Sequence, residues 1–400
     1  MRRAFRYLSV ALRVRWRRLA QRINYGGRRP PICDDVATWA YRHQGAVAVP
    51  VLEPGRRRRN LPRTVEELIL PVQSLIVDSQ WPGRYLVPVK NARIIGRNGL
   101  VVLPDGSYSA EWWYNADKVR KESDYDAPPR RRVVRESGSY FPLLISHLAG
   151  RTNYYHWMHD TLLRYYGVAE FLPREVKFVV SADLAPFQRE SLRCIGITDD
   201  QCVTFDEHAV WELETLYFAR PTSKSGGSRP EPCLWLRDVI LAAYGLESVG
   251  TRRLFVSRRR ASARRLVNED VVEGVLRKHG FETIVAEDLS FQEQVTTFAG
   301  ASVIAATHGA GLTNMLFAAP CSTVIEVLPG SRTETPNYYW TMADVLGHAY
   351  WYFLGESVPS GGSEPDMRVP IEKLEATLEA ALAETYDPRE TRGQRSRWSH

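Results

Sequence analysis

Two short segments of the sequence combine side chains that could perform acid–base or phosphate chemistry. The first is the run NYYHWMHD, residues 153–160. On a helix, His156 and Asp160 are four residues apart and share a face, so either could accept a proton from a hydroxyl group. The same spacing, with His159 alongside, could hold a metal ion, but no further ligand cluster with suitable spacing occurs, so we expect no metal. The alternative is a helix start with buried aromatic rings and a hydrogen-bonded histidine.

The second segment is the run HGAGLTN, residues 308–314, which lies between a predicted strand and a predicted helix. Ligands of open parallel sheets bind at the carboxyl ends of the strands, where a glycine turn lets the backbone approach them closely. The helix start adds free N–H groups that suit a phosphate. A turn that needs glycine for its geometry alone is the alternative, but the polar neighbours favour a site. The candidate residues are His308, Gly309, Ala310, Gly311, Thr313 and Asn314.

An arginine-rich run, Ser257-Arg258-Arg259-Arg260, follows the predicted strand 254–256. Adjacent strand-to-helix turns of such a sheet lie at the same edge, so we expect Arg258 to reach a phosphate held at the glycine turn. Its forked guanidinium donates two parallel hydrogen bonds, which suits a diphosphate. For the remaining arginines of this stretch we expect a solvated basic loop; they are Arg259, Arg260, Arg264 and Arg265.

Motifs that the sequence lacks disfavour several enzyme classes. No GxGxxG occurs, which disfavours a nicotinamide cofactor, and no GxxxxGK[ST] occurs, which excludes a P-loop enzyme. The glycine turn is similar to the oxyanion loop of some α/β-hydrolases, but no GxSxG nucleophile motif accompanies it, so a hydrolase is weakly supported.

Beyond residue 250 the predicted elements alternate between strand and helix. A capping box, Ser290 to Glu293, opens one helix, and Asn268 is expected to cap another. This alternation indicates a parallel, doubly wound sheet. The predicted strands are 254–256, 283–285, 303–306 and 324–327, and the last predicted helix is 370–384.

Before residue 250 the pattern is less regular, and residues 30–145 predict no particular fold. Pro186 is expected to open a helix and Gly196 to follow its end. The predicted elements are a helix over 153–166, a strand over 177–180, a helix over 186–194, strands over 203–205 and 215–219, a loop over 223–232 and a helix over 233–244.

The 400-residue chain has a formal net charge of +7, and its arginines are clustered. Residues 1–29 contain ten Arg and no acid, and further runs lie at 56–59 and 130–132. Such runs suit an anionic partner. They lie outside the best-defined domain and match no nucleic-acid-binding motif, so we expect no nucleic acid, although a nucleic-acid-binding protein is one alternative.

The first 25 residues predict a basic amphipathic helix that can lie on an anionic membrane surface. Packing on the protein's own body, or a loose arm, is the alternative. Arginines interrupt any signal-peptide core, no run of ~18 apolar residues occurs, and five scattered cysteines fit a reducing compartment. We therefore expect a protein that is cytoplasmic or peripheral on the inner face of the plasma membrane. The apolar positions are Phe5, Leu8, Leu12, Trp16, Leu19 and Ile23.

Taken together, NYYHWMHD, LFVSRR and LSFQEQVTTFAGASVIAATHGAGLTNMLFAAPCSTVIEVLP resemble glycosyltransferase family 61, over residues 140–354. The resemblance implies an α/β fold of the GT-B type, with two Rossmann-like, doubly wound domains facing a cleft and the nucleotide on the C-terminal half. It implies inverting transfer of a sugar from a nucleotide-sugar donor to a saccharide or lipid-linked saccharide, with no metal or other cofactor. Bacterial members often occur in capsule or exopolysaccharide gene sets, which suggests a role in cell-surface polysaccharide synthesis.

The resemblance also assigns roles to the acid–base pair. Asp160 is the candidate general base, with His156 beside it. Attack by the deprotonated acceptor on one face of an oxocarbenium-like centre predicts inversion at the anomeric carbon.

On the donor side, the resemblance implies that His308 and the glycine turn meet the diphosphate, assisted by Ser257 and Arg258. Asn314 would contact the diphosphate or the base. Glu326, at the end of the predicted strand 324–327, would accept hydrogen bonds from the ribose hydroxyls, or else be a structural acid.

The domains expected on this basis are a basic helix (1–29), an N-terminal acceptor-side domain (30–250), a nucleotide-sugar-binding domain (251–369) and a C-terminal helix and tail (370–400). One departure from the family pattern is Asp124-Tyr125-Asp126, the D-x-D signature of the other large glycosyltransferase fold. It lies in a charged stretch, where two acids are expected to be solvated. A non-catalytic assembly scaffold that retained the fold is a further alternative.

Overall fold

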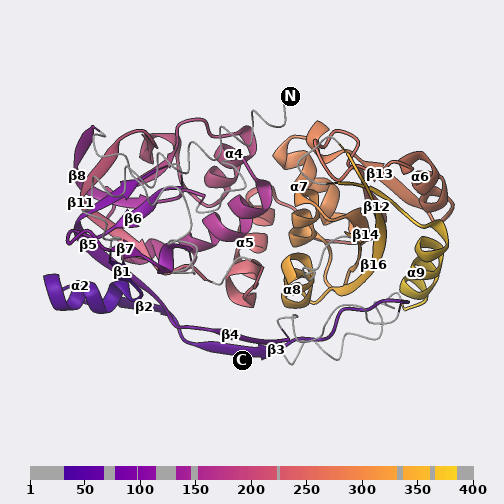
Figure 1. Ribbon diagram of the computed structural model, residues 1–400, viewed down its shortest axis with the longest axis horizontal. Coiled ribbons are helices and arrows are strands. Elements are labelled where there is room, and N and C mark those ends of the chain that lie inside the picture. Colours follow the sequence, from indigo (N-terminus) through magenta and orange to yellow (C-terminus); the bar gives the residue numbers. More distant parts are fainter. Residues whose placement is uncertain are drawn as a thin grey trace. The chain divides into compact units, whose positions relative to one another are not determined.

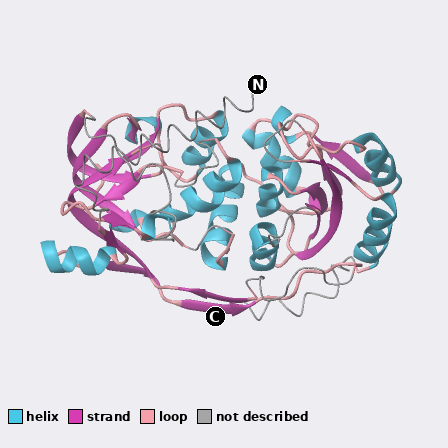
Figure 2. Ribbon diagram, viewed as in Figure 1, coloured by secondary structure: helices cyan, strands magenta, loops and turns pink. Residues whose placement is uncertain are grey.

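The computed structural model describes residues 31–66, 77–96, 98–113, 132–145, 152–222, 226–330, 337–360 and 365–384. These residues form a mixed α/β protein with parallel and antiparallel strands, so the predicted α/β class is confirmed (Figure 1, Figure 2). The predicted amphipathic helix, the D-x-D sequence and the predicted tail lie outside the described residues. Within the described ranges, no helix is both long enough and apolar enough to cross a membrane.

Contacts divide the chain into two units that interleave along the sequence. Unit 1 comprises Met1–Pro54, Pro82–Ala185 and Ile197–Lys224, and unit 2 comprises Gly55–Trp81, Pro186–Gly196 and Ser225–His400. The chain therefore passes between the units after residues 54, 81, 185, 196 and 224. The boundary predicted from the sequence between the two main domains was near residue 250.

Unit 1 contains a mixed sheet in the order β1-β7-β6-β5-β11-β8-β9-β10, with β2 also pairing with β5. β8, β9, β10 and β11 form parallel pairs, whereas β5 is antiparallel to β2, β6 and β11. This sheet differs from the doubly wound sheet expected for the N-terminal half, because antiparallel neighbours need no helical crossover. The strands are β1 (Ile32–Cys33), β2 (Val49–Leu52), β5 (Arg84–Ile95), β6 (Leu100–Val102), β7 (Tyr108–Ser109), β8 (Val133–Pro142), β9 (Lys177–Ser181), β10 (Cys202–Phe205) and β11 (Val210–Ala219).

Short helices flank this sheet. The N-cap of α2 (Val36–Gln44) is Asp35, whose carboxylate accepts a hydrogen bond from the Thr38 N–H, and the helix ends at Gly45 with a left-handed φ of 65°. The core of unit 1 includes Val87, Leu213 and Phe218. The remaining short helical turns are η2 (Glu111–Trp113), η6 (Ala169–Phe171) and η7 (Asp199–Gln201).

The segment that carries the predicted acid–base pair is helical but not an α-helix. It consists of the π-helix η4 (His156–Thr161) followed by the 3-10 helix η5 (Leu162–Tyr165), where a single helix over 153–166 had been expected. The Thr161 hydroxyl donates to the His156 carbonyl at 3.2 Å, five residues back, which matches the wide π turn. The buried guanidinium of Arg84 then donates to the carbonyls of Arg164 and Tyr166, where the helix ends.

Unit 2 contains a sheet in the order β13-β12-β14-β15-β16-β17. The first five strands run parallel, and β17 is antiparallel to β16. α6 (Glu269–Lys278) and α9 (Ile371–Ala383) cover one face of this sheet, and α7 (Phe291–Ala299) and α8 (Asn337–Leu346) cover the other (Figure 1). The strands are β12 (Arg252–Val256), β13 (Phe281–Ile284), β14 (Ala301–Thr307), β15 (Thr323–Pro329), β16 (Ala349–Val358) and β17 (Asp366–Arg368).

Most helices of unit 2 follow the sequence prediction, but α8 was not predicted. The capping box of Ser290 and Glu293 is present at the start of α7. α5 begins at Pro230, earlier than predicted, because proline is well suited to the first helical turn. Asn268 does not cap α6 with its side chain; instead it exchanges hydrogen bonds of 2.9 and 3.0 Å with the backbone of Val369. The helices are α4 (Pro186–Cys194), α5 (Pro230–Ala243), α6 (Glu269–Lys278), η8 (Ala286–Asp288), α7 (Phe291–Ala299), η9 (Ala310–Phe317), α8 (Asn337–Leu346) and α9 (Ile371–Ala383).

The order of the parallel strands fixes where a ligand site can form in unit 2. The chain forms β12 first, then adds β13 on one side and β14, β15 and β16 on the other. The direction of winding therefore reverses between β12 and β14, and the carboxyl ends of strands at such a reversal are the usual ligand site. The segments that follow these two strands begin with Ser257 and His308.

A hairpin from the N-terminal part of the chain belongs to unit 2. It is formed by β3 (Gly55–Arg58) and β4 (Asp78–Trp81). Arg57 donates to the Asp344 carboxylate at 2.9 Å, and Arg59 donates to the same oxygen at 3.0 Å. The Arg59 side chain is fully buried, so burial lowers its pKa while Asp344 acts against that shift. Part of the arginine run at 56–59 is thus structural.

We expect Asp344→Ala to lower the free energy of unfolding by about 3–5 kcal/mol, because it would leave a buried guanidinium without its carboxylate. Urea denaturation would measure the loss. The control is Asp288→Ala, which breaks a solvent-exposed pair with Arg260 and should cost less than about 1 kcal/mol. Similar losses in the two variants would contradict a structural role for the buried pair.

Candidate active site

The glycine turn and Arg258 meet at the winding reversal of unit 2. Gly309 has an extended backbone with a φ of 174°, so its conformation does not require glycine. A Cβ atom added there would lie 1.8 Å from Nη1 of Arg258. Glycine is therefore needed at this position to let the guanidinium lie against the backbone. Arg258 therefore lies next to the glycine turn, as expected from the predicted sheet topology.

The guanidinium of Arg258 is held by the loop that follows β12. Its Nη2 donates to the Ala263 carbonyl at 2.9 Å, and its Nε donates to the Arg264 carbonyl at 3.2 Å. Two of the three guanidinium nitrogens are thereby fixed by hydrogen bonds. The third, Nη1, lies nearest Gly309. A guanidinium oriented in this way is prepared to donate to an anion.

The segment after Gly309 is η9, a 3-10 helix where an α-helix had been expected. Gly311 lies so close to β12 that an added Cβ would be 2.9 Å from Cγ1 of Val256. This tight packing of the turn on the strand leaves little room for a side chain. The first N–H groups of a 3-10 helix still lack partners within the helix, so the turn keeps donors for an anion.

A buried carboxylate lies directly behind the turn. Glu326 on β15 is fully buried, and its Oε1 is 2.5 Å from Nδ1 of His308. Its other oxygen accepts a hydrogen bond from the hydroxyl of Tyr350 on β16. Burial, followed by the charge of Glu326, raises the pKa of Tyr350 well above its ordinary value. The carboxylate thus connects β15 to the end of β14 and to β16.

Two further groups line this region and were not identified from the sequence. The ring of Tyr339 on α8 meets the His308 ring edge-on, with 5.3 Å between centroids. Thr307 is 2% exposed, and its buried hydroxyl has no hydrogen-bond partner among the described residues. A buried hydroxyl without a partner is costly, so Thr307 is suited to bind a polar ligand group.

Two predicted donor residues are engaged in local structure. The Ser257 hydroxyl donates to the Glu269 carboxylate and accepts from Nε of Arg259 at 3.0 Å. Asn314, fully buried, donates to Oε1 of Gln294 on α7 at 3.0 Å. These bonds fix the β12–α6 connection and the packing of η9 on α7. Their roles toward a donor stay predictions.

The predicted acid–base pair forms a compact cluster in unit 1. Nδ1 of His156 lies 2.6 Å from Oδ2 of Asp160, and Nδ1 of His159 lies 2.9 Å from Oδ1. Burial alone would raise the pKa of Asp160, but the hydrogen bonds and charges of both histidines outweigh it and hold that pKa far below its ordinary value. Both carboxylate oxygens are therefore occupied by imidazole nitrogens.

Aromatic rings hold this cluster in place. Tyr155 stacks on His159 with 4.9 Å between centroids and meets His156 edge-on at 5.3 Å. His156 and His159 are 6% and 3% exposed, so the imidazoles are largely enclosed. Within the described ranges, no group of three or more His, Cys, Asp or Glu side chains is arranged to hold a metal ion.

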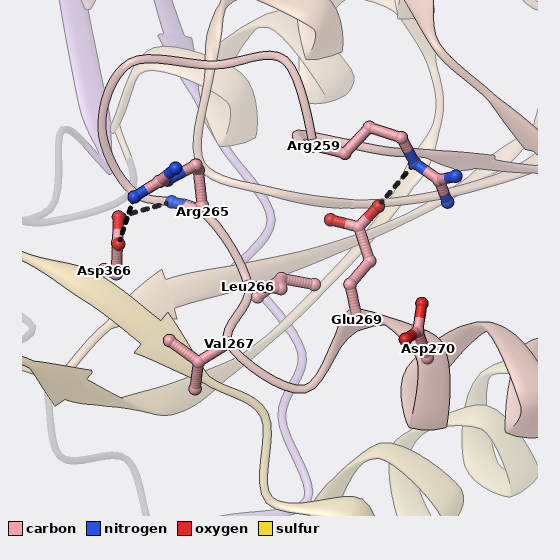
Figure 3. A pocket seen from close by; sticks show the side chains of 7 residues that line it. All are labelled: Arg259, Arg265, Leu266, Val267, Glu269, Asp270 and Asp366. Atoms are coloured by element: carbon pink, nitrogen blue, oxygen red, sulfur yellow. Dashed lines mark hydrogen bonds and ion pairs between the residues drawn. The ribbon is translucent and has the colours of Figure 1, made fainter.

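A pocket of about 390 Å³ lies beside the β12–α6 loop (Figure 3). It contains paired charges: Arg265 contacts Asp366, and Arg259 contacts Glu269. None of the residues predicted to act in catalysis or donor binding lines it. The lining residues are Arg259, Arg265, Leu266, Val267, Glu269, Asp270 and Asp366.

Comparison with known proteins gives two findings. Residues 154–325 match the family model described as Glycosyltransferase 61. Over 247 residues the chain is 25% identical to the β-1,2-xylosyltransferase XAX1 of Oryza sativa subsp. japonica, a match that covers 55% of this chain and 43% of that protein. The chain thus spans less than half the length of this relative. The family match includes the His156–Asp160 cluster and the glycine turn.

A buried histidine contacts the backbone of η9 and should make the stability of the fold depend on pH. His348 is 7% exposed, and its Nε2 lies 3.0 Å from the Met315 carbonyl, to which the neutral ring donates. Burial lowers the pKa of His348 from 6.5 to about 4. Protonation of His348 is therefore resisted by the folded protein.

We expect the free energy of unfolding to fall by about 3 kcal/mol between pH 6.5 and 4 because of His348, since the unfolded chain binds the proton first as the pH drops. Denaturant unfolding at several pH values would measure this. In His348→Asn that part of the pH dependence should vanish, whereas the exposed His208→Asn should retain it. An unchanged slope in His348→Asn would refute the assignment.

Proposed function

We propose that the protein transfers a sugar from a nucleotide-sugar donor to an acceptor hydroxyl, because residues 154–325 match the family model described as Glycosyltransferase 61. The family resemblance inferred from the sequence is confirmed over this segment. The observation that supports donor binding most directly is the guanidinium of Arg258 against Gly309, at the carboxyl ends of β12 and β14. An oriented cation beside a glycine turn suits the diphosphate of such a donor.

In this proposal, unit 2 stabilises the leaving group. The nucleoside diphosphate gains negative charge as the glycosidic bond breaks, and fixed donors placed at that charge lower the barrier by a few kcal/mol each. Arg258 and the first N–H groups of η9 would supply those donors. The Thr307 hydroxyl, buried beside them, would donate to the same group.

The contacts of His308 and Glu326 suggest distinct roles for these two residues. With Nδ1 bound to Glu326, the His308 ring has a fixed orientation and would meet the donor through Nε2. Both oxygens of Glu326 are already engaged, by His308 and Tyr350. This favours the structural role for Glu326 over a contact with the ribose hydroxyls.

The cluster in unit 1 would activate the acceptor. A carboxylate whose charged form is stabilised by two imidazoles is a weak proton acceptor, which argues that Asp160 acts through a histidine. In the proposed mechanism, Nε2 of His156 takes the proton of the attacking hydroxyl. Asp160, bound to Nδ1, holds the ring and stabilises the imidazolium that forms. Asp160 and His156 thus act as one base.

The remaining features of the proposal follow from the family resemblance. The transfer is inverting and independent of metal, and the two halves adopt the GT-B arrangement. The acceptor is a saccharide or lipid-linked saccharide of a cell-surface polysaccharide, and the protein works in the cytoplasm or at the inner face of the plasma membrane. Because the rice relative is named for xylosyl transfer, the donor is as readily a pentose as a hexose.

Product NMR that showed retention at the anomeric carbon would refute the single-attack mechanism.

The first test is a thermal-shift screen of the wild type against UDP, GDP, CMP and their sugars, including pentoses. A nucleotide at about 100 times its Kd should add about 2.7 kcal/mol of stability. We expect one nucleotide to stabilise the wild type and to lose that effect in Arg258→Ala.

The matched control is Arg260→Ala, which removes an exposed arginine of the same loop and should respond to nucleotide like the wild type. If no nucleotide stabilises the wild type while a control protein responds, the donor site proposed here is wrong.

The second test separates chemistry from donor binding. Asp160→Asn and His156→Ala should each lower kcat by about 10²–10⁴-fold, because general-base catalysis contributes that much, while nucleotide binding stays unchanged. Steady-state kinetics with the donor found in the screen would measure this. A variant of either residue with wild-type kcat would contradict the acid–base assignment.

A further inference from the structure

The turn that carries the proposed base is a π-helix, η4 (His156–Thr161). π turns are rare, and they occur frequently at functional sites. In an α-helix, consecutive side chains do not face each other. Here the consecutive residues His159 and Asp160 do meet, with 2.9 Å between Nδ1 and Oδ1. The segment that departs from the α-helix is thus the one that places a second imidazole on the carboxylate bound to His156.

The charge of Asp160 fixes the hydrogens of both rings. Burial would raise the pKa of Asp160, but the hydrogen bonds and charges of the two histidines outweigh it, so the carboxylate is ionised and can only accept hydrogen bonds. Both Nδ1 atoms must therefore carry a hydrogen, and each donates it to one carboxylate oxygen. The neutral ring of His156 then has its lone pair on Nε2, the atom proposed to take the proton of the acceptor.

His159 is the more enclosed of the two histidines. Its side chain is 1% exposed, against 7% for His156 and 12% for Asp160. The ring of Tyr155 stacks on His159 with an interplanar angle of 13°, whereas it meets His156 edge-on at 84°. The two imidazoles are therefore steeply inclined to each other on one carboxylate. Because His159 is screened from an acceptor, it can act on the reaction only through Asp160.

The contact with His159 restrains the orientation of the carboxylate. The terminal torsion of an aspartate is broad, so a carboxylate held by one donor can rotate. Two donors, one on each oxygen, restrict that rotation, and Oδ2 of Asp160 then lies 2.6 Å from Nδ1 of His156. Without His159, a buried and charged oxygen would lose a donor, which is costly. The carboxylate would turn to recover a donor, and it would orient His156 less well.

We propose that His159 is a positioning residue, which holds the Asp160 carboxylate in the orientation that keeps the hydrogen of His156 on Nδ1 and its Nε2 ready to accept a proton; this rests on the function proposed above. His159 itself touches neither substrate. The part of its side chain that acts is the Nδ1–H donor, and the ring that stacks on Tyr155 only supports it. The sequence had placed His159 only in an alternative metal site.

The test uses two variants of the whole chain that separate the donor from the ring. His159→Phe keeps a flat ring against Tyr155 but has no N–H, whereas His159→Asn loses the ring but keeps a side-chain N–H. We expect His159→Phe to lower kcat by about 10- to 100-fold, the effect of losing a hydrogen bond to a charged group, with KM and the Kd of the nucleotide found in the screen unchanged. His159→Asn should recover most of that loss. The control is His208→Phe, the same change at an exposed site, which should have wild-type kcat.

A second measurement reports the tautomer without any substrate. Nitrogen NMR of protein with labelled histidines, at about pH 8 where an ordinary histidine is neutral, should show the hydrogen of His156 on Nδ1. His156→Ala identifies its signals. In His159→Phe a fraction of His156 should carry the hydrogen on Nε2 instead, and in His159→Asn it should stay on Nδ1. An unchanged His156 tautomer in His159→Phe would overturn the inference.

The outcomes distinguish this inference from the proposed function. If Asp160→Asn loses kcat while His159→Phe has wild-type kcat, the inference about His159 is wrong and the proposed base stands. The same holds if His159→Asn loses as much kcat as His159→Phe, because the ring and not the donor would then be what matters. If Asp160→Asn and His156→Ala both retain wild-type kcat, the proposed base is wrong and this inference fails with it.

Discussion

The C-terminal half of the fold depends on one buried carboxylate. Glu326 lies within the parallel sheet with no exposed surface, and such a group is tolerated only when both oxygens are hydrogen-bonded. His308, directly after β14, and Tyr350, on β16, satisfy this requirement from either side of β15. Because His308 also begins the glycine turn, the same contacts fix where the turn starts and how η9 leaves the sheet. The geometry opposite Arg258 thus follows from satisfying the hydrogen bonds of a carboxylate inside the core.

The parts of the fold that could be predicted are those with local signals. The alternation of unit 2 up to β15 was predicted correctly because each repeat carries its own boundaries, such as the capping box at Ser290 and the glycine after strand β14. α8, β16 and β17 were not predicted. Unit 1 could not be predicted, since β5 and β11 pair antiparallel across more than a hundred residues and no local pattern records that choice. The buried role of Arg59 on the β3–β4 hairpin was missed for the same reason: its partner Asp344 is 285 residues away.

In the candidate site, too, features with local sequence signals could be predicted and those set by long-range packing could not. The His156–Asp160 contact followed from helical spacing, which also placed His159 alongside, whereas the π turn did not follow from it. The proximity of Arg258 and Gly309 was predicted from the rule that strand-to-helix turns lie at one edge of the sheet. The positions of Tyr339 and Thr307 depend on tertiary packing, which residue spacing does not predict. For Ser257 and Asn314, residue type suggested ligand binding, but the structure engages both side chains in bonds within the protein.

The interleaving of the two units has a consequence for the order of events during synthesis. The hairpin that carries Arg59 is translated early, yet its carboxylate partner Asp344 follows 285 residues later. At roughly 5–20 residues per second, the ribosome needs about 15–60 s to supply it. During that interval the hairpin cannot bury its arginines, and unit 2 cannot be completed from its C-terminal residues alone. The protein is therefore a poor candidate for division into independently folding halves at any single point of the chain.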